Sequence, residues 1–511
     1  MKFHRKYDKT TVNRIRYTIF RGGGMYRTQA SERQTPSAHN EEDMGMKWNN
    51  HHVSDIKMAY IGGGSKAWAW KLMADLALEP ALDGTVWLYD IDARAAEENQ
   101  IIGSQLKERK EAAGRWDYKV AYSLKEALKG ADFVVISILP GTFEEMRSDV
   151  HLPERLGIYQ SVGDTAGPGG MVRALRTLPM YEEIALAIRE FCPFAWVISY
   201  TNPMSLCVAS LYKTFPEIKA FGCCHEVFGT QKVLAAIASQ ELGTGPIDRK
   251  DIHVNVLGIN HFTWFDAASY EGADLFPVYK KYIGTHFEEG YDDPDRPWEK
   301  STFNCRHRVK FDLFNRYGLI AAAGDRHLAE FMPGNTYLND PETVRSWKFG
   351  LTTVDFRISQ MEERLARRKR LIQGEEQMEI VPSGEEGVQQ IKALVGLDRM
   401  VSNVNMPNSF LQIPNLPKEA VVETNAVFSR DSIRAVAAGP LPEPIRELIL
   451  PHVQNHGYIL EAADTYDRNL VVKAFMNDPL VKHKCRDEGE IRKLADDMIH
   501  NTERYLPAGW K

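Results

Sequence analysis

The sequence predicts an α/β fold, in which an N-terminal Rossmann-like, doubly wound parallel sheet is followed by a mixed α+β C-terminal domain. Between residue 55 and about residue 245, short apolar stretches alternate with helical patterns, which is typical of parallel strands joined by helices. A glycine-rich turn follows the first apolar stretch. Past about residue 245 the pattern changes to longer helical segments with proline-rich connections, which favours a second domain.

Each element of the predicted sheet is a short apolar stretch followed by a turn or a helical pattern. The first strand covers 56–61, and a helix over 68–78 follows the turn. The second strand covers 85–90 and ends in an acid, and residues 93–112 are expected to be helical. Further strands are expected at 132–139, 195–200 and 218–222, with a helix over 179–191. In the C-terminal part we expect a strand at 252–257 and helices over 353–374 and 385–399.

The length and composition exclude several classes of protein. The chain has 511 residues, which at roughly 150 residues per domain allows two to four domains. Lys and Arg number 63 against 69 Asp and Glu, so the net charge of −6 argues against a general nucleic-acid-binding surface. The sequence contains no run of about 18 apolar residues, so we expect no membrane-spanning helix. Six cysteines are too few for a disulfide-stabilised scaffold.

We divide the chain into residues 1–54, 55–245 and 246–511. Residues 1–54 are rich in basic and polar residues and lack hydrophobic periodicity, so we expect a disordered N-terminal extension. They hold no apolar segment of the kind that a secretory signal needs. A transit peptide and a translation start at Met44 or Met46 are the alternatives. Residues 55–245 are expected to form the Rossmann-like domain and residues 246–511 the C-terminal domain.

The glycine turn fits a dinucleotide-binding fingerprint. Gly62 and Gly64, with Ala67 at the third position, lie between a predicted strand and a predicted helix whose N-terminal amides can bind phosphate. Gly62 permits the tight turn, and Gly64 would let the backbone approach a pyrophosphate. Asp90 ends the next strand, where an acid binds the ribose hydroxyls and favours NAD over NADP. The alternative is an ordinary glycine-rich loop.

Polar residues gather where strands of such a sheet should end. Ligands of open α/β sheets bind at these carboxyl ends, and a thiol and imidazoles meeting there could hold a divalent transition metal. The spacing alone leaves the alternative that Cys223 and Cys224 are buried small side chains and His261 a core histidine. The four motifs are Thr201-Asn202-Pro203, Gly222-Cys223-Cys224-His225-Glu226, Gly258-Ile259-Asn260-His261 and Gly324-Asp325-Arg326-His327.

Taken together, these motifs make the chain resemble glycoside hydrolase family four, the NAD- and manganese-dependent glycosidases. The resemblance runs from about Lys57 to Asp478. Cys-His-Glu-Val at 224–227 and the stretches 161–170 and 323–331 are similar to the branch that acts on α-galacturonides. The ordered motifs that carry the resemblance are Ile61-Gly62-Gly63-Gly64-Ser65, Leu88-Tyr89-Asp90-Ile91-Asp92, Tyr200-Thr201-Asn202-Pro203, Gly222-Cys223-Cys224-His225, Leu257-Gly258-Ile259-Asn260-His261 and Gly324-Asp325.

The resemblance implies a mechanism without the usual pair of carboxylates. NAD would oxidise the third carbon of the sugar, a base would remove the proton on the second carbon, and the glycosidic oxygen would leave by elimination. Water addition and return of the hydride would complete the reaction. Residues 55–245 would then bind NAD, and residues 246–511 would form the substrate-binding and catalytic domain.

The resemblance also assigns roles to individual residues. Cys224 and His261 match the metal ligands, and the metal, manganese in many members, would polarise the transient ketone. Asp325 matches the base, with Tyr317 as the alternative. His225 would help the leaving oxygen depart as an acid, or would have a structural role beside the metal. The cofactor-binding residues would be Gly62, Gly64, Ser65 and Asp90, and Asn202 and Asn260 would contact sugar hydroxyls.

A uronate substrate needs a partner for its carboxylate, and the planar fork of arginine suits this task. Three arginines lie in or near the signature stretches, namely Arg326, Arg173 and Arg176, and the sequence does not choose among them. Arg326 represents them in the predicted substrate site. We therefore expect an α-galacturonidase, with an α-galactosidase or α-glucuronidase as alternatives.

Two hypotheses of other classes remain open at this point, namely an NAD-dependent hydroxy-acid dehydrogenase and a nucleotide-binding sensor without turnover. The absence of a recognisable signal and the need for a reduced Cys224 favour a cytoplasmic protein. The resemblance further implies a homodimer or homotetramer, with no nucleic-acid or membrane partner.

Overall fold

The computed structural model describes residues 45–510. Residues 1–44, and with them most of the extension predicted over 1–54, lie outside the described residues. For residues 45–54 the expected disorder is wrong, because β1 (Lys47–Asn49) pairs antiparallel with the start of β2 (His52–Ile61). The pair is anchored because Val53 is fully buried and the Trp48 indole donates a hydrogen bond of 2.8 Å to the Val395 carbonyl oxygen.

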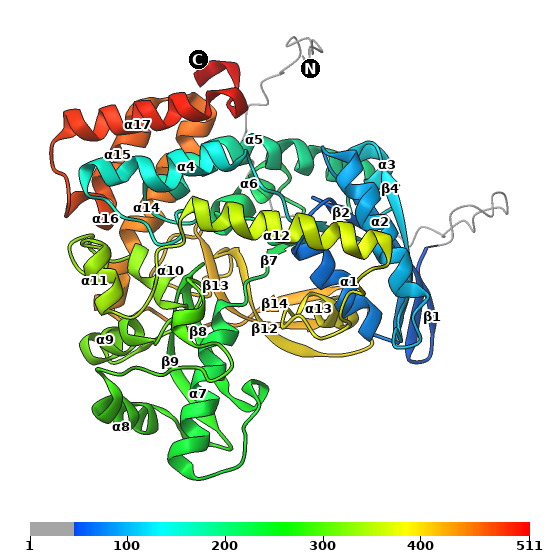
Figure 1. Cartoon of the computed structure of the whole chain (residues 1–511), viewed down its shortest axis with the longest axis horizontal. Helices are drawn as coiled ribbons and strands as arrows, with labels where there is room; N and C mark the ends of the chain where they lie inside the picture. The colour runs from blue at the N-terminus through cyan, green and yellow to red at the C-terminus, as the bar shows by residue number, and fades with distance from the viewer. Residues whose placement is uncertain (1–44, 511) are drawn as a thin grey trace, which may run out of the picture. The chain divides into compact units, whose positions relative to one another are not determined.

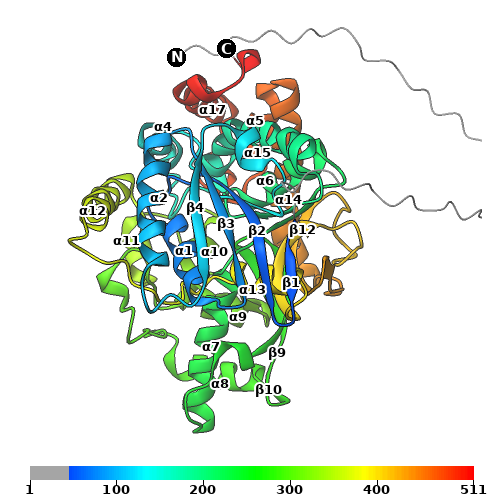
Figure 2. The ribbon, with the colours of Figure 1, turned by 90° about the vertical axis from the view of Figure 1, so that its right-hand side faces the viewer.

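The main sheet contains six parallel strands in the Rossmann order (Figure 2). Its strands lie in the order β14-β13-β12-β7-β6-β5-β2-β3-β4, with β1 beside β2. The order along the chain reverses between β2 and β5, so the glycine turn after β2 lies at the switch point where such sheets bind ligands. The predicted doubly wound parallel sheet is confirmed. Its parallel strands are β2, β3 (Leu82–Tyr89), β4 (Arg115–Ala121), β5 (Phe133–Ile136), β6 (Trp196–Ser199) and β7 (Lys219–Gly222).

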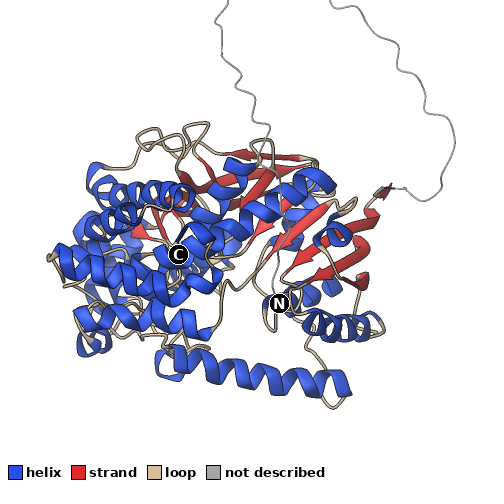
Figure 3. Cartoon of the chain, turned by 90° about the horizontal axis from the view of Figure 1, so that it is seen from above, coloured by secondary structure: helices blue, strands red, loops and turns tan. Residues whose placement is uncertain are grey.

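Helices cover both faces of this sheet (Figures 1 and 3). Successive residues of a strand point to opposite faces, so Met58 and Tyr60 pack with one set of helices and Ala59 and Ile61 with the other. The first set is α1 (Trp68–Leu78), α2 (Ala93–Lys107) and α13 (Gly387–Leu394). The second set is α3 (Leu124–Leu128), α5 (Gly167–Phe191) and α6 (Met204–Thr214).

Strand β4 and helices α5 and α2 are among the elements that differ from the sequence prediction. Strand β4 was not predicted, because its exposed Arg115, Asp117 and Lys119 alternate with buried residues and conceal its apolar content. Helix α5 begins twelve residues before Pro179, since this proline is tolerated inside the helix although proline usually ends one. Helix α2 ends at Lys107 instead of residue 112.

The C-terminal part adds a second sheet and extends the first. The four-stranded second sheet is antiparallel, with β9 (Phe262–Tyr270) paired to β8 (His253–Ile259), β10 (Ala273–Asp274) and β11 (Ile320–Ala321). In the first sheet, β12 (Met400–Pro407) pairs antiparallel with β7 and is followed by β13 (Val421–Ser429) and β14 (Ser432–Ala435). The segments on either side of residue 245 therefore share one sheet, and a division there stays a prediction.

The remaining helices surround these sheets, and no helix of residues 45–510 combines the length and the apolar character needed to cross a membrane. Helix α12 lies along α2 and α4 (Figure 1). These helices are α4 (Phe143–His151), α7 (Glu226–Leu242), α8 (Phe276–His286), α9 (Arg308–Tyr317), α10 (Asp325–Glu330), α11 (Pro341–Ser346), α12 (Val354–Gln373), α14 (Glu443–Thr465), α15 (Arg468–Asn477), α16 (Pro479–Lys482) and α17 (Glu488–Thr502).

Candidate active site

The glycine turn is fixed by close packing on both sides. Gly62 has a φ of +93°, and a Cβ there would lie 2.0 Å from the Ser137 carbonyl oxygen, just past β5. A Cβ on Gly64 would lie 2.6 Å from the Ala95 Cβ of α2. Both positions therefore need glycine for the turn to fit between the end of β5 and α2, whatever ligand approaches it.

Asp90 and Ser65 shape the same turn. The Asp90 carboxylate accepts hydrogen bonds from the backbone amides of Gly64 and Asp92, both at 2.9 Å. The Ser65 hydroxyl accepts one from the Trp68 amide at 3.1 Å, at the start of α1. A carboxylate has about four lone-pair sites, so Asp90 keeps the capacity to bind ribose hydroxyls as well.

Asn99 supports the turn from α2 and was not identified from the sequence. Its fully buried amide donates hydrogen bonds to the carbonyl oxygens of Gly63 at 2.7 Å and Ser65 at 2.8 Å, and it accepts one from the Trp70 indole. An asparagine in the middle of a polar helical stretch carries no recognisable signal, because its partners lie 29 to 36 residues earlier in the chain.

His261 has the surroundings of a metal ligand. It lies in the turn between β8 and β9 with a φ of +63°, and its Nδ1 is 3.0 Å from the Thr165 hydroxyl. That hydroxyl donates to the Asp164 carboxylate at 2.8 Å. Because Nδ1 is engaged, Nε2 is the ring nitrogen left to bind a cation, and such a supporting chain is typical of metal-bound histidines.

Cys224 follows β7 and has a buried side chain. Burial raises the pKa of its thiol, the nearby Glu423 and Glu226 raise it further, and the Asn260 amide opposes them. A divalent cation would stabilise the thiolate against this environment. Both predicted ligands lie near Glu226, which acts on the pKa of each. That the thiol and the free imidazole nitrogen share one cation stays a prediction.

Glu226 lies at the centre of the charged groups. Its carboxylate accepts a hydrogen bond of 2.7 Å from the Gly324 amide and lies 3.6 Å from the His327 Nε2 and 3.9 Å from the His225 Nε2. Burial alone would raise the pKa of Glu226, but these histidines, His261 and the amide hold it well below its usual range. Glu226 is therefore ionised and gives the site a fixed negative charge.

His225 lies between the predicted metal ligand Cys224 and the helix that follows the glycine turn. Its Nδ1 lies 3.2 Å from the Glu385 carboxylate, and its ring lies 6.1 Å from that of Trp68 at the start of α1. Burial works to lower the pKa of His225, but Glu385 raises it overall. The side chain remains 45% exposed, so the imidazole is accessible to a ligand.

Asp325 is the first residue of α10, and its fully buried carboxylate lies against the N-terminus of α9. Its two carboxylate oxygens accept hydrogen bonds from the Val309 and Lys310 amides, both at 3.2 Å. Burial raises the pKa of Asp325 to about 6, although the Lys310 ammonium opposes this shift. The alternative base, Tyr317, is the last residue of α9 and packs edge-on against Trp264. The choice of Asp325 over Tyr317 as the base stays a prediction.

Lys310, Cys305 and His307 surround Asp325 and were also not identified from the sequence. Cys305, His307 and Asp325 bring three possible ligand atoms within 4.8 Å of one another, and within residues 45–510 they form a group of that kind. Burial lowers the pKa of the adjacent His307, and the buried Lys310 ammonium lowers it further. Lys310 also donates a hydrogen bond of 2.8 Å to the Thr230 hydroxyl.

Asn202 and Asn260 each keep a side-chain oxygen without a hydrogen-bond partner although both oxygens are buried. The Asn260 amide nitrogen donates to Glu423 at 3.3 Å, and the Asn202 backbone oxygen accepts from the Arg173 Nε at 3.0 Å. Buried polar atoms normally have partners, so these oxygens fit the hydroxyls of a polar ligand.

Of the three arginines considered as partners of a substrate carboxylate, Arg176 has no free guanidinium nitrogen, so this role is wrong for it. It is fully buried, both terminal nitrogens bind Asp149, and its Nε donates to the Pro140 carbonyl oxygen at 2.8 Å. Arg173 points to Asn202 and Asp164. Arg326 lies over the Phe303 ring and donates to the Thr352 hydroxyl at 2.6 Å.

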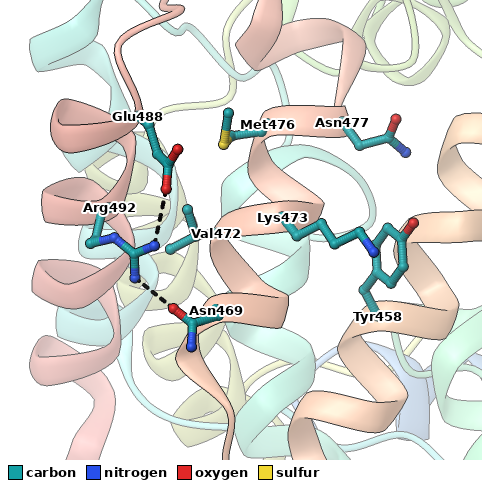
Figure 4. A pocket seen from close by; sticks show the side chains of 8 residues that line it. All are labelled: Tyr458, Asn469, Val472, Lys473, Met476, Asn477, Glu488 and Arg492. Carbon is teal, nitrogen blue, oxygen red and sulfur yellow. Dashed lines mark hydrogen bonds and ion pairs between the residues drawn. The ribbon is translucent and has the colours of Figure 1, made fainter.

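A cavity of about 430 Å³ lies away from these residues, among α14, α15 and α17 (Figure 4). Its polar side chains largely pair with one another, since Arg492 binds Asn469 and Glu488, and Lys473 lies over the Tyr458 ring. None of the predicted site residues lines it.

Comparisons with known proteins agree with the arrangement. The model of the family 4 glycosyl hydrolases matches residues 57–240, and that of the family's C-terminal domain matches residues 256–481. An alpha-galacturonidase of Lachnoclostridium phytofermentans is 63% identical over 465 residues, which cover 91% of this chain and 100% of the relative.

Two crystal structures have the same fold. LplD of Bacillus subtilis has a TM-score of 0.83 at 50% identity and covers 87% of this chain and 100% of its own. A 6-phospho-alpha-glucosidase from gut microorganisms, solved with NAD and Mn²⁺, has a TM-score of 0.72 at 20% identity and covers 89% of this chain and 99% of its own.

Replacing Asn99 should weaken dinucleotide binding. Asn99→Ala leaves the carbonyl oxygens of Gly63 and Ser65 without their donor, so we expect NAD affinity to fall roughly tenfold in a calorimetric titration. Gln100→Ala, which removes a hydrogen bond from the same helix to the Tyr118 carbonyl oxygen, is the matched control. Equal affinities of the two variants would contradict the role of Asn99.

Replacing the Thr165 hydroxyl should weaken metal binding. Thr165→Val keeps the shape of the side chain but removes the link between His261 and Asp164, so we expect Mn²⁺ affinity to fall about 10- to 100-fold. Electron paramagnetic resonance of free Mn²⁺ measures this loss. Thr177→Val, at a buried threonine of α5 that bonds its own helix, should leave the affinity unchanged. A retained affinity in Thr165→Val would show that His261 does not depend on this link.

Proposed function

Because this chain belongs to family 4 of the glycosyl hydrolases, we propose that it hydrolyses α-galacturonides with NAD and a divalent cation such as Mn²⁺. The observation that carries the proposal is the identity of 63% to an alpha-galacturonidase that this chain covers over its full length. The chain of contacts from Asp164 through Thr165 to His261 supports the metal-dependent part.

The residues present fit both cofactors. Gly62, Gly64, Ser65 and Asp90 would hold the dinucleotide at the switch point of the sheet, and Cys224 and the His261 Nε2 would hold the cation. When bound, NAD supplies a reversible hydride acceptor, and the cation supplies a Lewis acid for the carbonyl oxygen of the transient ketone.

Asp325 would act as the base that accepts the proton from the second carbon of the sugar. A pKa near 6 suits this role, because the carboxylate is ionised at neutral pH and still basic enough to take a proton. The two amides of α9 hold the carboxylate in position.

His225 would donate a proton to the departing glycosidic oxygen. Glu385 holds its Nδ1, so Nε2 of the partly exposed ring is the nitrogen that would face the ligand. Asn202 and Asn260 would offer their unpartnered oxygens to sugar hydroxyls, and Arg326 would contact the uronate carboxylate.

The alternatives within the family, an α-galactosidase or an α-glucuronidase, are less favoured by the relatives. A net hydroxy-acid dehydrogenase does not need the pair Cys224 and His261, and a sensor without turnover does not need a base. We further propose that the protein works in the reducing cytoplasm, where Cys224 stays a thiol, and that it forms a homodimer or homotetramer.

A panel of nitrophenyl glycosides tests the proposed function directly. With NAD, Mn²⁺ and a thiol reductant, we expect release of nitrophenol from the α-galacturonide and much slower release from the α-galactoside, α-glucuronide and phospho-α-glucoside. No net NADH should accumulate. Full hydrolysis after removal of NAD and metal, or preference for another glycoside, would refute the proposal.

The pH dependence of the reaction tests the base. Since Asp325 must be ionised to accept a proton, kcat/KM should rise with pH through about 6 and then level off. Asp325→Asn should lower kcat about 10²- to 10⁴-fold, with Asp312→Asn on the neighbouring helix α9, where Asp312 pairs with Arg316, as the control. A substrate deuterated at the second carbon should react more slowly with the wild type. The absence of an isotope effect together with normal kcat in Asp325→Asn would rule out this base.

A further inference from the structure

We propose that Arg357 of α12 determines the preference for uronates by binding the substrate carboxylate together with Arg326. The inference rests on the proposed function and adds to it a residue that lies outside every motif from which the site was predicted. Arg357 comes from a helix that otherwise runs along α2 and α4 (Figure 1).

Backbone contacts hold the two arginines beside the same short segment. The Arg357 Nη2 donates to the Val162 carbonyl oxygen at 3.1 Å. The neighbouring Ser161 donates its hydroxyl to the Arg326 carbonyl oxygen at 2.5 Å and accepts the Thr352 amide at 2.9 Å. Since Thr352 also accepts a hydrogen bond from the Arg326 guanidinium, the two side chains start from a common framework.

Arg357 keeps hydrogen-bonding capacity that the protein does not use. Its Nε is buried and has no partner among the described residues. An unpaired buried donor on a charged group is costly, so a ligand that accepts this hydrogen bond would be bound strongly. A carboxylate is well matched, because its two oxygens accept from the fork of a guanidinium.

The balance of charges around Arg357 also favours an anionic ligand. Arg173, Arg326 and Arg357 lie close enough to influence one another's ionisation or that of Asp164. Burial opposes ionisation of Asp164, yet Arg173 and Arg357 lower its pKa to about 2, so it is a carboxylate.

Glu330 lies beside the same segment but does not add a second negative charge. Its carboxyl group accepts the Val162 and Gly163 amides, and burial raises its pKa to about 8, so it is protonated at neutral pH. Within residues 45–510, neither Arg326 nor Arg357 forms an ion pair with a carboxylate, and their guanidinium groups bind the Thr352 hydroxyl and the Val162 carbonyl oxygen. A uronate carboxylate would supply the missing ion partner, whereas the neutral hydroxymethyl group of a galactoside would not.

Selectivity between two otherwise identical substrates tests the proposal. The nitrophenyl α-galacturonide and α-galactoside differ in the carboxylate alone, and free galacturonate and galactose serve as competitive inhibitors where the galactoside reacts too slowly. In Arg357→Gln we expect KM for the galacturonide and Ki for galacturonate to rise about 10- to 100-fold, while kcat changes little and Ki for galactose stays the same. Arg357→Lys, which keeps the charge and loses the fork, should show an intermediate effect.

Arg367→Gln is the matched control, since Arg367 lies on the same helix and pairs with Glu376. Equal losses for both sugars, or unchanged selectivity in Arg357→Gln, would overturn the assignment and leave Arg357 a structural partner of Asp164. A wild-type enzyme without galacturonidase activity would instead reject the proposed function. Unchanged melting temperature and NAD affinity establish that a variant is folded. If Arg357→Gln does not fold, the selectivity of Arg357→Lys is compared with that of the wild type instead.

Discussion

The buried segment from Ser161 to Thr165 connects the parts of the site that come from distant regions of the chain. Ser161 contacts Arg326 and the segment before α12, and Val162 contacts Glu330 and Arg357. At its other end Thr165 holds His261. Because one short stretch sets the positions of an arginine pair and a predicted metal ligand, a shift of its backbone would displace both. The geometry of the site depends on these contacts more than on any single reactive group.

The two halves of the chain depend on each other through the shared sheet. Strand β12 continues the parallel sheet beside β7, and its Asn403 amide donates to the carbonyl oxygen of Cys224 at 3.0 Å and also binds Glu423. Glu423 in turn binds Asn260, the neighbour of His261. Both predicted metal ligands are therefore supported by strands β12 and β13, although they lie on elements earlier in the chain.

The features that were best predicted from the sequence are those that a local pattern of residues determines. The turn at Gly62 and Gly64 and the acid at Asp90 lie in a strand-turn-helix-strand stretch whose signals are close together, and the structure brings them into contact. Asn99 and Arg357 were missed because their partners lie more than 30 and nearly 200 residues away. Arg176 looked equivalent to Arg326 in sequence, and burial against Asp149 alone distinguishes them. The start of α5 was predicted too late in the chain, because proline usually breaks a helix and this helix accommodates Pro179.

Strand β4, whose charged residues concealed it in the sequence, forms one border of the main sheet. A border strand exposes backbone groups that could recruit a strand of a neighbouring molecule. Its alternating Arg115, Asp117 and Lys119 place charge along that border and make such recruitment unfavourable. At the opposite border the four-residue β14 offers little length to pair with. The sheet is thus protected at both ends against edge-to-edge aggregation.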